Sequence, residues 1–205
     1  CYPSDETASI IFEETAHFTC AQILRMLYND IGSIESWTKY PRKQLKNKVL
    51  LIIGSGKIGS IVRDLMKPFM IIKTFDLMYN TLDQLKPMMN IADCVTIHIP
   101  SSKENIKIIN KEKLSWLKNK SILINNSRGV IVEEKALYNE LKNNRLRSAF
   151  DVYWEEPYNG ILKKFHPHSF YMTPHIASTC EDFLIGCRKD LDNLILKYVS
   201  FNKCN

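Results

Sequence analysis

The chain has 205 residues, of which 45% are hydrophobic and 24% are charged. These values are typical of a globular protein with one large domain, or one domain with extensions, and they argue against a disordered or fibrous chain. The formal net charge of +6 comes from 28 basic and 22 acidic residues, and most of the excess is lysine spread along the chain, which disfavours nucleic acid as a partner.

Membrane and secreted proteins are disfavoured as well. No apolar run approaches the roughly eighteen residues that a membrane span needs, so no membrane partner is expected. The six cysteines include no C-x-x-C pair, which favours reduced thiols in a cytoplasmic protein. Because the first residue is a cysteine rather than a methionine, we expect a fragment or a processed form.

The first predicted element is a long amphipathic helix over residues 8–28, after a polar and irregular start at residues 1–7. Residues 29–47 contain glycine, proline and many charges, and they predict a loop or linker. Trp37 is expected to anchor this linker, in the core or at an interface. The basic cluster at residues 39–48 fits a solvated linker better than a nucleic-acid patch.

Residues 48–76 carry the pattern of a dinucleotide-binding turn. An apolar run at residues 49–53 predicts a strand that is buried on both faces, and the sequence G-S-G-K-I-G follows at residues 54–59. A predicted helix comes next, and a second apolar run at residues 69–72 predicts another strand shortly before Asp76. Strand, glycine turn, helix, strand and acid in this order indicate a dinucleotide site.

Each residue type has a physical role in such a turn. Gly54 allows a tight turn, Gly56 lets the backbone approach a diphosphate, and Gly59 lets the helix pack closely on the strand. The free N–H groups and the positive end of the helix dipole then face the phosphates. Asp76 is expected to accept hydrogen bonds from the adenosine ribose, and its charge favours NAD over NADP because it repels a 2′-phosphate.

The rest of the chain alternates between predicted strands and predicted helices. Strands are predicted at residues 92–99, 121–124, 148–152 and 170–172, and helices at residues 81–89, 110–117, 133–143 and 180–199. Strands that alternate with helices through short connections predict a doubly wound parallel α/β sheet, the Rossmann fold.

Ionisable residues follow three of the predicted strands, and the carboxyl ends of parallel strands meet at one edge of a sheet. They are Arg128, then Asp151 with Glu156, and then His175. An arginine can hold a substrate carboxylate through two hydrogen bonds, although Arg128 alone could also form a structural salt bridge. A histidine can move the proton that accompanies a hydride, and a carboxylate on its other ring nitrogen fixes the tautomer.

Other histidines and a second glutamate leave alternatives open. His98 ends a strand and is expected to pack or to bond the backbone rather than act as an acid. His166 and His168 form an H-x-H pair, for which an exposed loop is favoured over a metal site. Glu155 is adjacent to Glu156 and could take its role.

Several motifs occur together in a familiar order. They are Gly54-x-Gly56-x-Ile58-Gly59, Ala92-Asp93, His98-Ile99-Pro100, Asn125-x-x-Arg128-Gly129, Asp151-Val152-x-x-x-Glu156-Pro157 and Pro174-His175. From about residue 16 to the final helix, the chain resembles the NAD-binding domain of the D-isomer-specific 2-hydroxyacid dehydrogenases.

The resemblance implies a role for each motif. Arg128 would bind the carboxylate and carbonyl oxygen of the substrate, His175 would be the general acid–base, and Glu156 would pair with His175, with no metal required. Asp151 would lie near the nicotinamide carboxamide. The residues expected to bind NAD are Gly54, Gly56, Lys57, Ile58, Gly59, Asp76, Ile99, Pro100, Asn126, Ser127, Asp151 and His175.

The resemblance also implies a division of the chain and a function. Residues 1–47 would be a linking helix and hinge, residues 48–178 the NAD-binding domain, and residues 179–205 a helix that returns towards a substrate-binding lobe largely absent from this sequence. The expected activity is hydride transfer between NAD and a D-2-hydroxy acid or 2-keto acid, in a homodimer. The alternative is a non-catalytic, NAD-sensing dimeric scaffold of the corepressor type, which keeps the same triad.

Overall fold

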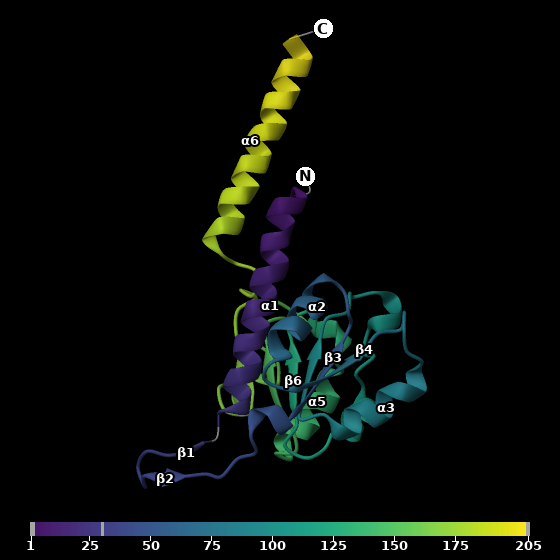
Figure 1. Cartoon of the computed structure of the whole chain (residues 1–205), viewed down its shortest axis with the longest axis vertical. Helices are drawn as coiled ribbons and strands as arrows, with labels where there is room; N and C mark the ends of the chain where they lie inside the picture. Colours follow the sequence, from purple (N-terminus) through teal and green to yellow (C-terminus); the bar gives the residue numbers. More distant parts are fainter. Residues whose placement is uncertain (1–2, 30, 204–205) are drawn as a thin grey trace.

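A computed structural model of the chain describes residues 3–29 and 31–203, and its centre is a six-stranded parallel sheet (Figure 1). The strands run in the spatial order β4-β3-β5-β6-β7-β8. Their bounds are β3 (Val49–Ile53), β4 (Ile71–Phe75), β5 (Cys94–Ile97), β6 (Ile122–Asn125), β7 (Arg147–Phe150) and β8 (Phe170–Met172). Every neighbouring pair is parallel, which confirms the predicted sheet.

Helices connect these strands and extend from both ends of the chain. The α-helices are α1 (Asp5–Leu27), α2 (Lys57–Met66), α3 (Leu82–Ile91), α4 (Lys111–Trp116), α5 (Glu134–Lys142) and α6 (Glu181–Lys203). Short 3₁₀ turns lie at Leu45–Asn47, Lys103–Asn105, Gly129–Ile131 and Lys163–Phe165. The predicted helices and strands are all present, with ends that shift by a few residues.

The sheet has a separate hydrophobic core on each face, because successive side chains of a strand point to opposite sides. In β3, Leu50 and Ile52 pack in one core with residues of α1 and α2. Leu51 and Ile53 pack in the other core with residues of α3, α4 and α5. This explains why the strand is a continuous apolar run rather than an alternating one.

The strand order creates a crevice above β3 and β5. The chain leaves β3 for β4 on one side through α2, and then crosses to β5 on the other side through α3. Connections that diverge from two adjacent strands leave an opening at their carboxyl ends, which is where such sheets bind ligands. In the described part of the chain, only β4 lies outside β3, whereas the order common in dinucleotide-binding sheets places two strands there.

The second strand of the fingerprint begins later than predicted. We expected the apolar run at residues 69–72 to be the strand, but β4 begins at Ile71. The N–H groups of Phe69 and Met70 instead bond to the carbonyl of Met66, at the end of α2. β4 is an edge strand that is partly exposed, so its hydrophobicity does not mark its ends.

The N-terminal helix begins three residues before its predicted start. The Ser4 side chain accepts a hydrogen bond from the N–H of Thr7 at 3.3 Å, and Asp5 and Glu6 lie in the first turn, near the positive end of the helix dipole. The prediction of an irregular start is therefore wrong for residues 5–7, and residues 1–2 lie outside the described part.

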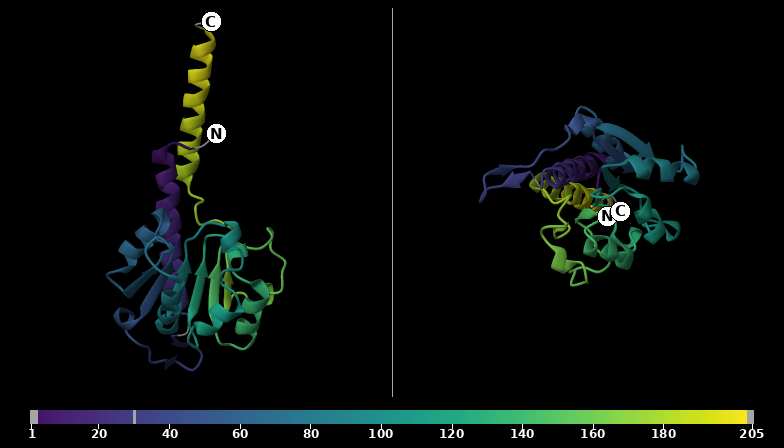
Figure 2. Two further views of the ribbon diagram at one scale, coloured as in Figure 1. Left: turned by 90° about the vertical axis from the view of Figure 1, so that its right-hand side faces the viewer. Right: turned by 90° about the horizontal axis from the view of Figure 1, so that it is seen from below.

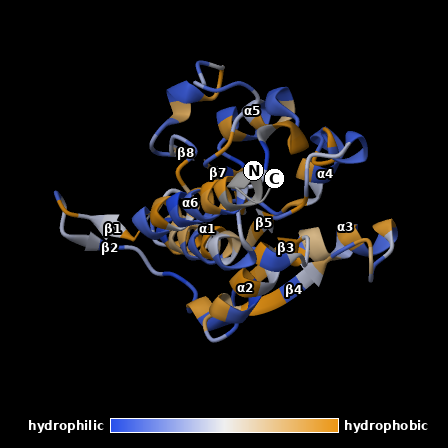
Figure 3. Cartoon of the chain, turned by 90° about the horizontal axis from the view of Figure 1, so that it is seen from above, coloured by the Kyte–Doolittle hydropathy of each residue, from blue (hydrophilic) through white to orange (hydrophobic). Residues whose placement is uncertain are grey.

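The start of α1 lies beside the first part of α6 above the sheet, and α6 continues well past the start of α1 (Figure 2). They approach closely because Gly186 of α6 has no side chain where it meets Thr7 of α1. The N–H of Ser4 also bonds to Asp190 at 2.8 Å. Apolar residues recur along α6 (Figure 3), and many are exposed, which is typical of a contact surface.

The predicted linker contains a small hairpin that projects from the body of the molecule (Figure 1). Its strands are β1 (Gly32–Ser33) and β2 (Thr38–Lys39). Trp37 lies at its turn and is 79% exposed, so the prediction that it anchors the linker in the core is wrong. An interface role for Trp37 stays a prediction, as does the division of the chain at residues 47 and 178.

None of the described helices is both long and apolar enough to cross a membrane.

The core on the α5 side can be tested at Phe150, which is 0% exposed and packs against the rings of Trp154 and Phe170. We expect Phe150→Ala to lower the free energy of unfolding by about 3–5 kcal/mol, because it leaves a cavity. Phe69→Ala is the matched control, since Phe69 is exposed, and we expect a loss of about 0.5 kcal/mol or less. Denaturant titration measures both, and equal losses would contradict the placement of Phe150.

Candidate cofactor and active site

The glycine turn joins β3 to α2 and leaves space only at its middle glycine. Gly54 has a φ of +99°, and a Cβ there would lie 2.4 Å from the carbonyl oxygen of His98. A Cβ on Gly59 would lie 2.0 Å from the carbonyl oxygen of Gly54. At Gly56, which precedes the first residue of α2, a Cβ would have no neighbour within 4 Å. The backbone is therefore open to a ligand at Gly56.

Two adjoining cavities follow the crevice on either side of this turn. One has a volume of about 280 Å³ and includes Asp76 in its lining. The other has a volume of about 470 Å³ and includes Arg128 in its lining. Both are lined by Gly56, His98, Ile99 and Pro100, and the larger one also by Lys57, Ile58, Asn126 and Ser127. The predicted cofactor residues from β3, β5 and β6 thus surround one extended opening.

Asp76 lies at the glycine turn, as the fingerprint predicts. Its carboxylate accepts hydrogen bonds from the N–H of Met78 at 3.0 Å and from the N–H of Ser55 at 2.7 Å. These bonds hold the pKa of Asp76 below its usual value, against the opposing effect of burial. The ionised carboxylate is thereby fixed beside the turn, where it can accept a hydrogen bond from a ribose hydroxyl.

Asn126 and Ser127 follow β6 and close the larger cavity. The Asn126 amide donates a hydrogen bond to Thr19 of α1 at 2.8 Å, and Ser127 Oγ donates one to the carbonyl of Ile99. Asn126 Oδ1 is buried and has no hydrogen-bond partner in the described part of the chain. A buried oxygen of this kind is costly unless a ligand donates to it. Together with the space at Gly56, it fits a bound dinucleotide.

Glu156 and His175 form the predicted pair. His175 Nδ1 lies 2.8 Å from Glu156 Oε2, and the other carboxylate oxygen of Glu156 accepts a hydrogen bond from the N–H of Tyr153 at 3.0 Å. Burial tends to raise the pKa of Glu156, but these two hydrogen bonds and the positive charges of His175 and Arg128 bring it below its usual value. Glu156, rather than Glu155, is thus the partner of His175.

Arg128 lies on the same side of the molecule as this pair. Its positive charge acts on Glu156, and its guanidinium donates a hydrogen bond to the carbonyl of Ser127 at 2.6 Å. The side chain is exposed and lines the larger cavity. The structure therefore brings Arg128, Glu156 and His175 together from the ends of β6, β7 and β8.

Asp151 is buried under the loop that carries His175, with 0% of its surface exposed. It accepts hydrogen bonds from Thr173 Oγ1 at 2.6 Å, from the N–H of Ile176 at 3.0 Å and from the N–H of Ala177 at 2.8 Å. Through these bonds, Asp151 holds in place the residues before and after His175. Its predicted proximity to the nicotinamide stays a prediction.

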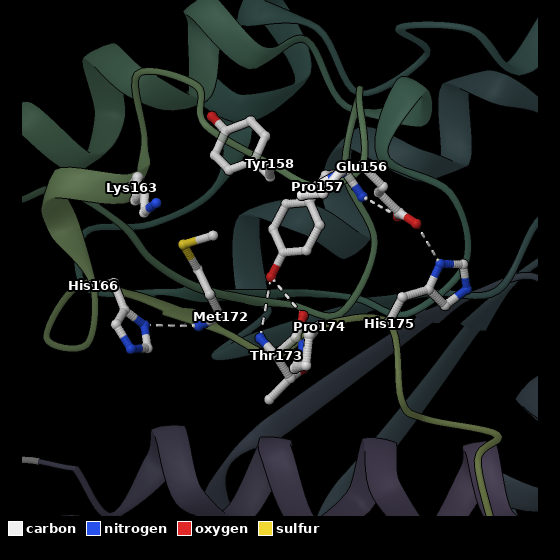
Figure 4. A pocket seen from close by; sticks show the side chains of 10 residues that line it. Glu156, Pro157, Tyr158, Lys163, His166, Met172, Thr173, Pro174 and His175 are labelled. Atoms are coloured by element: carbon white, nitrogen blue, oxygen red, sulfur yellow. Dashed lines mark hydrogen bonds and ion pairs between the residues drawn. The ribbon is translucent and has the colours of Figure 1, made fainter.

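A separate cavity of about 510 Å³ also borders Glu156 and His175. Lys163, His166 and Met172 lie at its other end (Figure 4). The His175 ring nitrogen that is not bonded to Glu156 points away from these residues (Figure 4). This cavity shares no lining residue with the two at the glycine turn, so it is not the space that those two enclose.

The other histidines fit the structural interpretation of the sequence. Burial lowers the pKa of His98 to about 4, so its ring is neutral at pH 7, and it bonds Thr96 Oγ1 at 3.0 Å. His166 lies in a loop and accepts a hydrogen bond from the N–H of Met172 at 3.1 Å. Among the described residues, no group of three or more acidic, histidine or cysteine side chains could hold a metal ion.

Besides His98 and Ser101, which adjoin predicted cofactor residues in the sequence, sequence reasoning missed Phe12 of α1 in the lining of the larger cavity. Its position in an amphipathic helix gave no signal, because the helix lies far from the fingerprint in sequence. Only the packing of α1 beside α2 brings Phe12 to the glycine turn.

A matched pair of glycine variants tests this geometry. We expect Gly56→Ala to leave the free energy of unfolding within about 0.5 kcal/mol of the wild type, because space surrounds a Cβ there. It should weaken NADH binding about tenfold or more, since the methyl group takes the place of the diphosphate.

Gly59→Ala should instead destabilise the protein without ligand, because its Cβ would meet the backbone of Gly54. Thermal unfolding and calorimetric titration with NADH separate the two effects. Undiminished NADH binding by Gly56→Ala would contradict the placement of the diphosphate.

Comparison with known proteins shows the family to which the chain belongs. Residues 24–177 match the family model described as D-isomer specific 2-hydroxyacid dehydrogenase, NAD binding domain. D-3-phosphoglycerate dehydrogenase of Synechocystis sp. is 31% identical over 171 residues, which cover 75% of this chain and 30% of that protein. Glyoxylate reductase of Thermofilum pendens is 28% identical over 201 residues, which cover 84% of this chain and 58% of that protein.

Solved structures show the same fold. D-lactate dehydrogenase from Aquifex aeolicus, in complex with NAD and lactic acid, superposes with a TM-score of 0.75 at 22% identity and covers 92% of this chain and 67% of that one. The chain spans about a third to three fifths of the curated relatives named above. It belongs to the D-isomer-specific 2-hydroxyacid dehydrogenase family, and it carries the NAD-binding domain of that family.

Proposed function

We propose that the protein carrying this chain is an NAD-dependent oxidoreductase that transfers a hydride between nicotinamide and a D-2-hydroxy acid or its 2-keto acid. The observation that carries the proposal is the 2.8 Å contact between His175 and Glu156, with the charge of Arg128 close to the same carboxylate. The three side chains lie at the edge of the sheet where the glycine turn opens. Family membership supports the same chemistry.

Bound NADH supplies the hydride, and the chain supplies the proton and the substrate's orientation. Glu156 engages Nδ1 of His175, which leaves Nε2 of the imidazole to face the substrate oxygen. As the carbonyl is reduced, the protonated ring donates its Nε2 proton to the developing alkoxide, and in the reverse direction it accepts that proton. The Glu156 carboxylate holds the ring in place through both directions.

Arg128 is proposed to bind the anionic end of the substrate. Its guanidinium is exposed in the larger cavity, and the structure gives it a hydrogen bond to the carbonyl of Ser127. A guanidinium has five N–H donors in a planar fork that matches a carboxylate. The arginine can therefore bind the carboxylate of a 2-keto acid and polarise the adjacent carbonyl oxygen while His175 transfers the proton.

Asp76 supports NAD rather than NADP as the cofactor. Its ionised carboxylate is held at the glycine turn by two backbone N–H groups. A 2′-phosphate on the adenosine ribose would bring a second negative charge close to this carboxylate. The residues that follow Asp76, at positions 77–80, include no arginine that could neutralise this phosphate. We therefore propose that the site prefers the unphosphorylated ribose.

The activity is tested on the whole protein that carries this chain, by following NADH oxidation with a panel of 2-keto acids, including glyoxylate, hydroxypyruvate and pyruvate. We expect turnover with at least one of them, and a loss of about a hundredfold or more in kcat for His175→Gln, because the proton donor is removed. His168→Gln is the matched control, since His168 is exposed in a loop, and its rate should match the wild type.

Two outcomes would contradict the proposal. An unchanged rate in His175→Gln would remove this residue from the mechanism. Binding of NADH without turnover of any 2-keto acid would favour the non-catalytic scaffold instead.

We also propose that the protein is a homodimer and that the β1–β2 hairpin contributes to the interface. The hairpin projects from the body (Figure 1), and Ile31, Ile34 and Trp37 on it are exposed. Exposed apolar side chains that are grouped on a projecting element are typical of a protein–protein contact.

Light scattering after size-exclusion chromatography tests the dimer. We expect the mass of two chains for the wild type and a shift towards the monomer for Trp37→Ser. Tyr79→Ser is a matched control, because Tyr79 is equally exposed but lies outside the hairpin. A wild-type mass of one chain at all concentrations would rule the dimer out.

The cytoplasmic location stays a prediction. Cys20, Cys94, Cys180 and Cys187 are free thiols in the structure, which fits a reducing compartment.

A further inference from the structure

Phe12 and Lys57 meet at the amino end of α2, although they come from different helices. The ammonium of Lys57 lies 4.7 Å from the centre of the Phe12 ring. Lys57 is the first residue of α2, and both side chains line the 470 Å³ cavity together with Arg128. Neither of them lines the neighbouring cavity that contains Asp76.

The position of Lys57 is electrostatically unfavourable without a partner. The amino end of a helix carries a partial positive charge, so a lysine ammonium at the first residue is repelled there. The face of an aromatic ring attracts a cation, and the Phe12 ring supplies such a face beside the glycine turn. An anion at the same place would be attracted both by the ammonium and by the free N–H groups of α2.

A lysine side chain is a flexible stem with a charged end, so it does not by itself hold a fixed direction. Phe12 is half-buried on α1, and its helix packs against α2. The ring therefore offers a fixed surface that restricts where the ammonium can lie. Restricting the ammonium before the ligand arrives lowers the entropy lost on binding.

We propose that Phe12 is a cofactor-positioning residue, which holds the Lys57 ammonium beside the diphosphate of a bound dinucleotide on its nicotinamide side. The nicotinamide side follows from the lining of the two cavities, since Phe12 and Lys57 share theirs with Arg128 and not with Asp76. The proposal rests on the proposed function, because it assumes that the dinucleotide occupies this crevice.

Calorimetric titrations of the full chain with NADH, ADP-ribose and AMP test the proposal. Phe12→Leu should weaken NADH and ADP-ribose about three- to tenfold, because the ring that directs the ammonium is lost. AMP carries a single phosphate on the adenosine side, so its affinity should stay within about twofold. Phe12→Tyr keeps an aromatic face and should bind all three probes like the wild type.

Phe18→Leu is the matched control, because Phe18 lies on the same helix and does not line either cavity of the crevice. It should bind NADH like the wild type. A loss in Phe18→Leu equal to that in Phe12→Leu would overturn the proposal, since both losses would then come from a disturbed α1. An equal loss of AMP in Phe12→Leu would overturn it for the same reason.

A double-mutant cycle with Lys57→Met shows whether Phe12 acts through the lysine. We expect Lys57→Met to weaken NADH by a similar factor, and Phe12→Leu to add little to it. Fully additive losses would overturn the proposal. Lys57→Met also tests the proposal by itself if Phe12→Leu does not fold. An affinity of Lys57→Met for NADH and ADP-ribose equal to that of the wild type would overturn the proposal.

The failure of this inference differs from the failure of the proposed function. If the wild-type chain does not bind NADH, the cofactor assignment itself is wrong and the inference falls with it. If the wild type binds NADH and Phe12→Leu binds it equally well, only the role of Phe12 is overturned.

Discussion

The close approach of α2 to the end of β3 is the constraint on which the site depends. Gly59 lies so near the carbonyl of Gly54 that no side chain fits between them, and this contact brings the amino end of α2 over the crevice between β3 and β5. The Asp76 carboxylate then bonds the N–H of Ser55, so β4 is tied to the same turn. The glycine turn, the amino end of α2 and the acidic residue therefore act as one unit, because one packing contact and one hydrogen bond set their positions.

The half of the site that contains Glu156 and His175 has its own support, which is the buried carboxyl group of Asp151. Asp151 accepts three hydrogen bonds from the loop around His175, and His175 itself has a φ of +55°, which is uncommon for a residue with a side chain. Hydrogen bonds to a buried carboxylate can hold a backbone in such a conformation. His175 is thereby directed to Glu156, which reaches it from the segment after β7. The position of the pair thus depends on Asp151, which is buried beneath the loop that carries His175.

Local patterns predicted most of the fold and most of the site, because the features that matter there are short in sequence. The glycine spacing, the apolar run of β3 and the acid after β4 all follow from neighbouring residues, and so do the residues at the ends of β6, β7 and β8. Features set by tertiary packing could not be predicted in this way. Phe12 reaches the cavity only because α1 packs beside α2. The start of β4 could not be predicted from hydrophobicity, because an edge strand is less apolar than a central one. The exposure of Trp37 depends on the direction in which the hairpin projects.

The central claim is that one dinucleotide joins these two halves, with its diphosphate at the amino end of α2 and its nicotinamide beside Arg128 and His175. A crystal structure of the chain with NADH tests this most directly. The account predicts phosphate oxygens bonded to the N–H groups at the start of α2, ribose hydroxyls bonded to Asp76, and the nicotinamide ring between Arg128 and His175. NADH bound outside the crevice, or with its ribose away from Asp76, would contradict it.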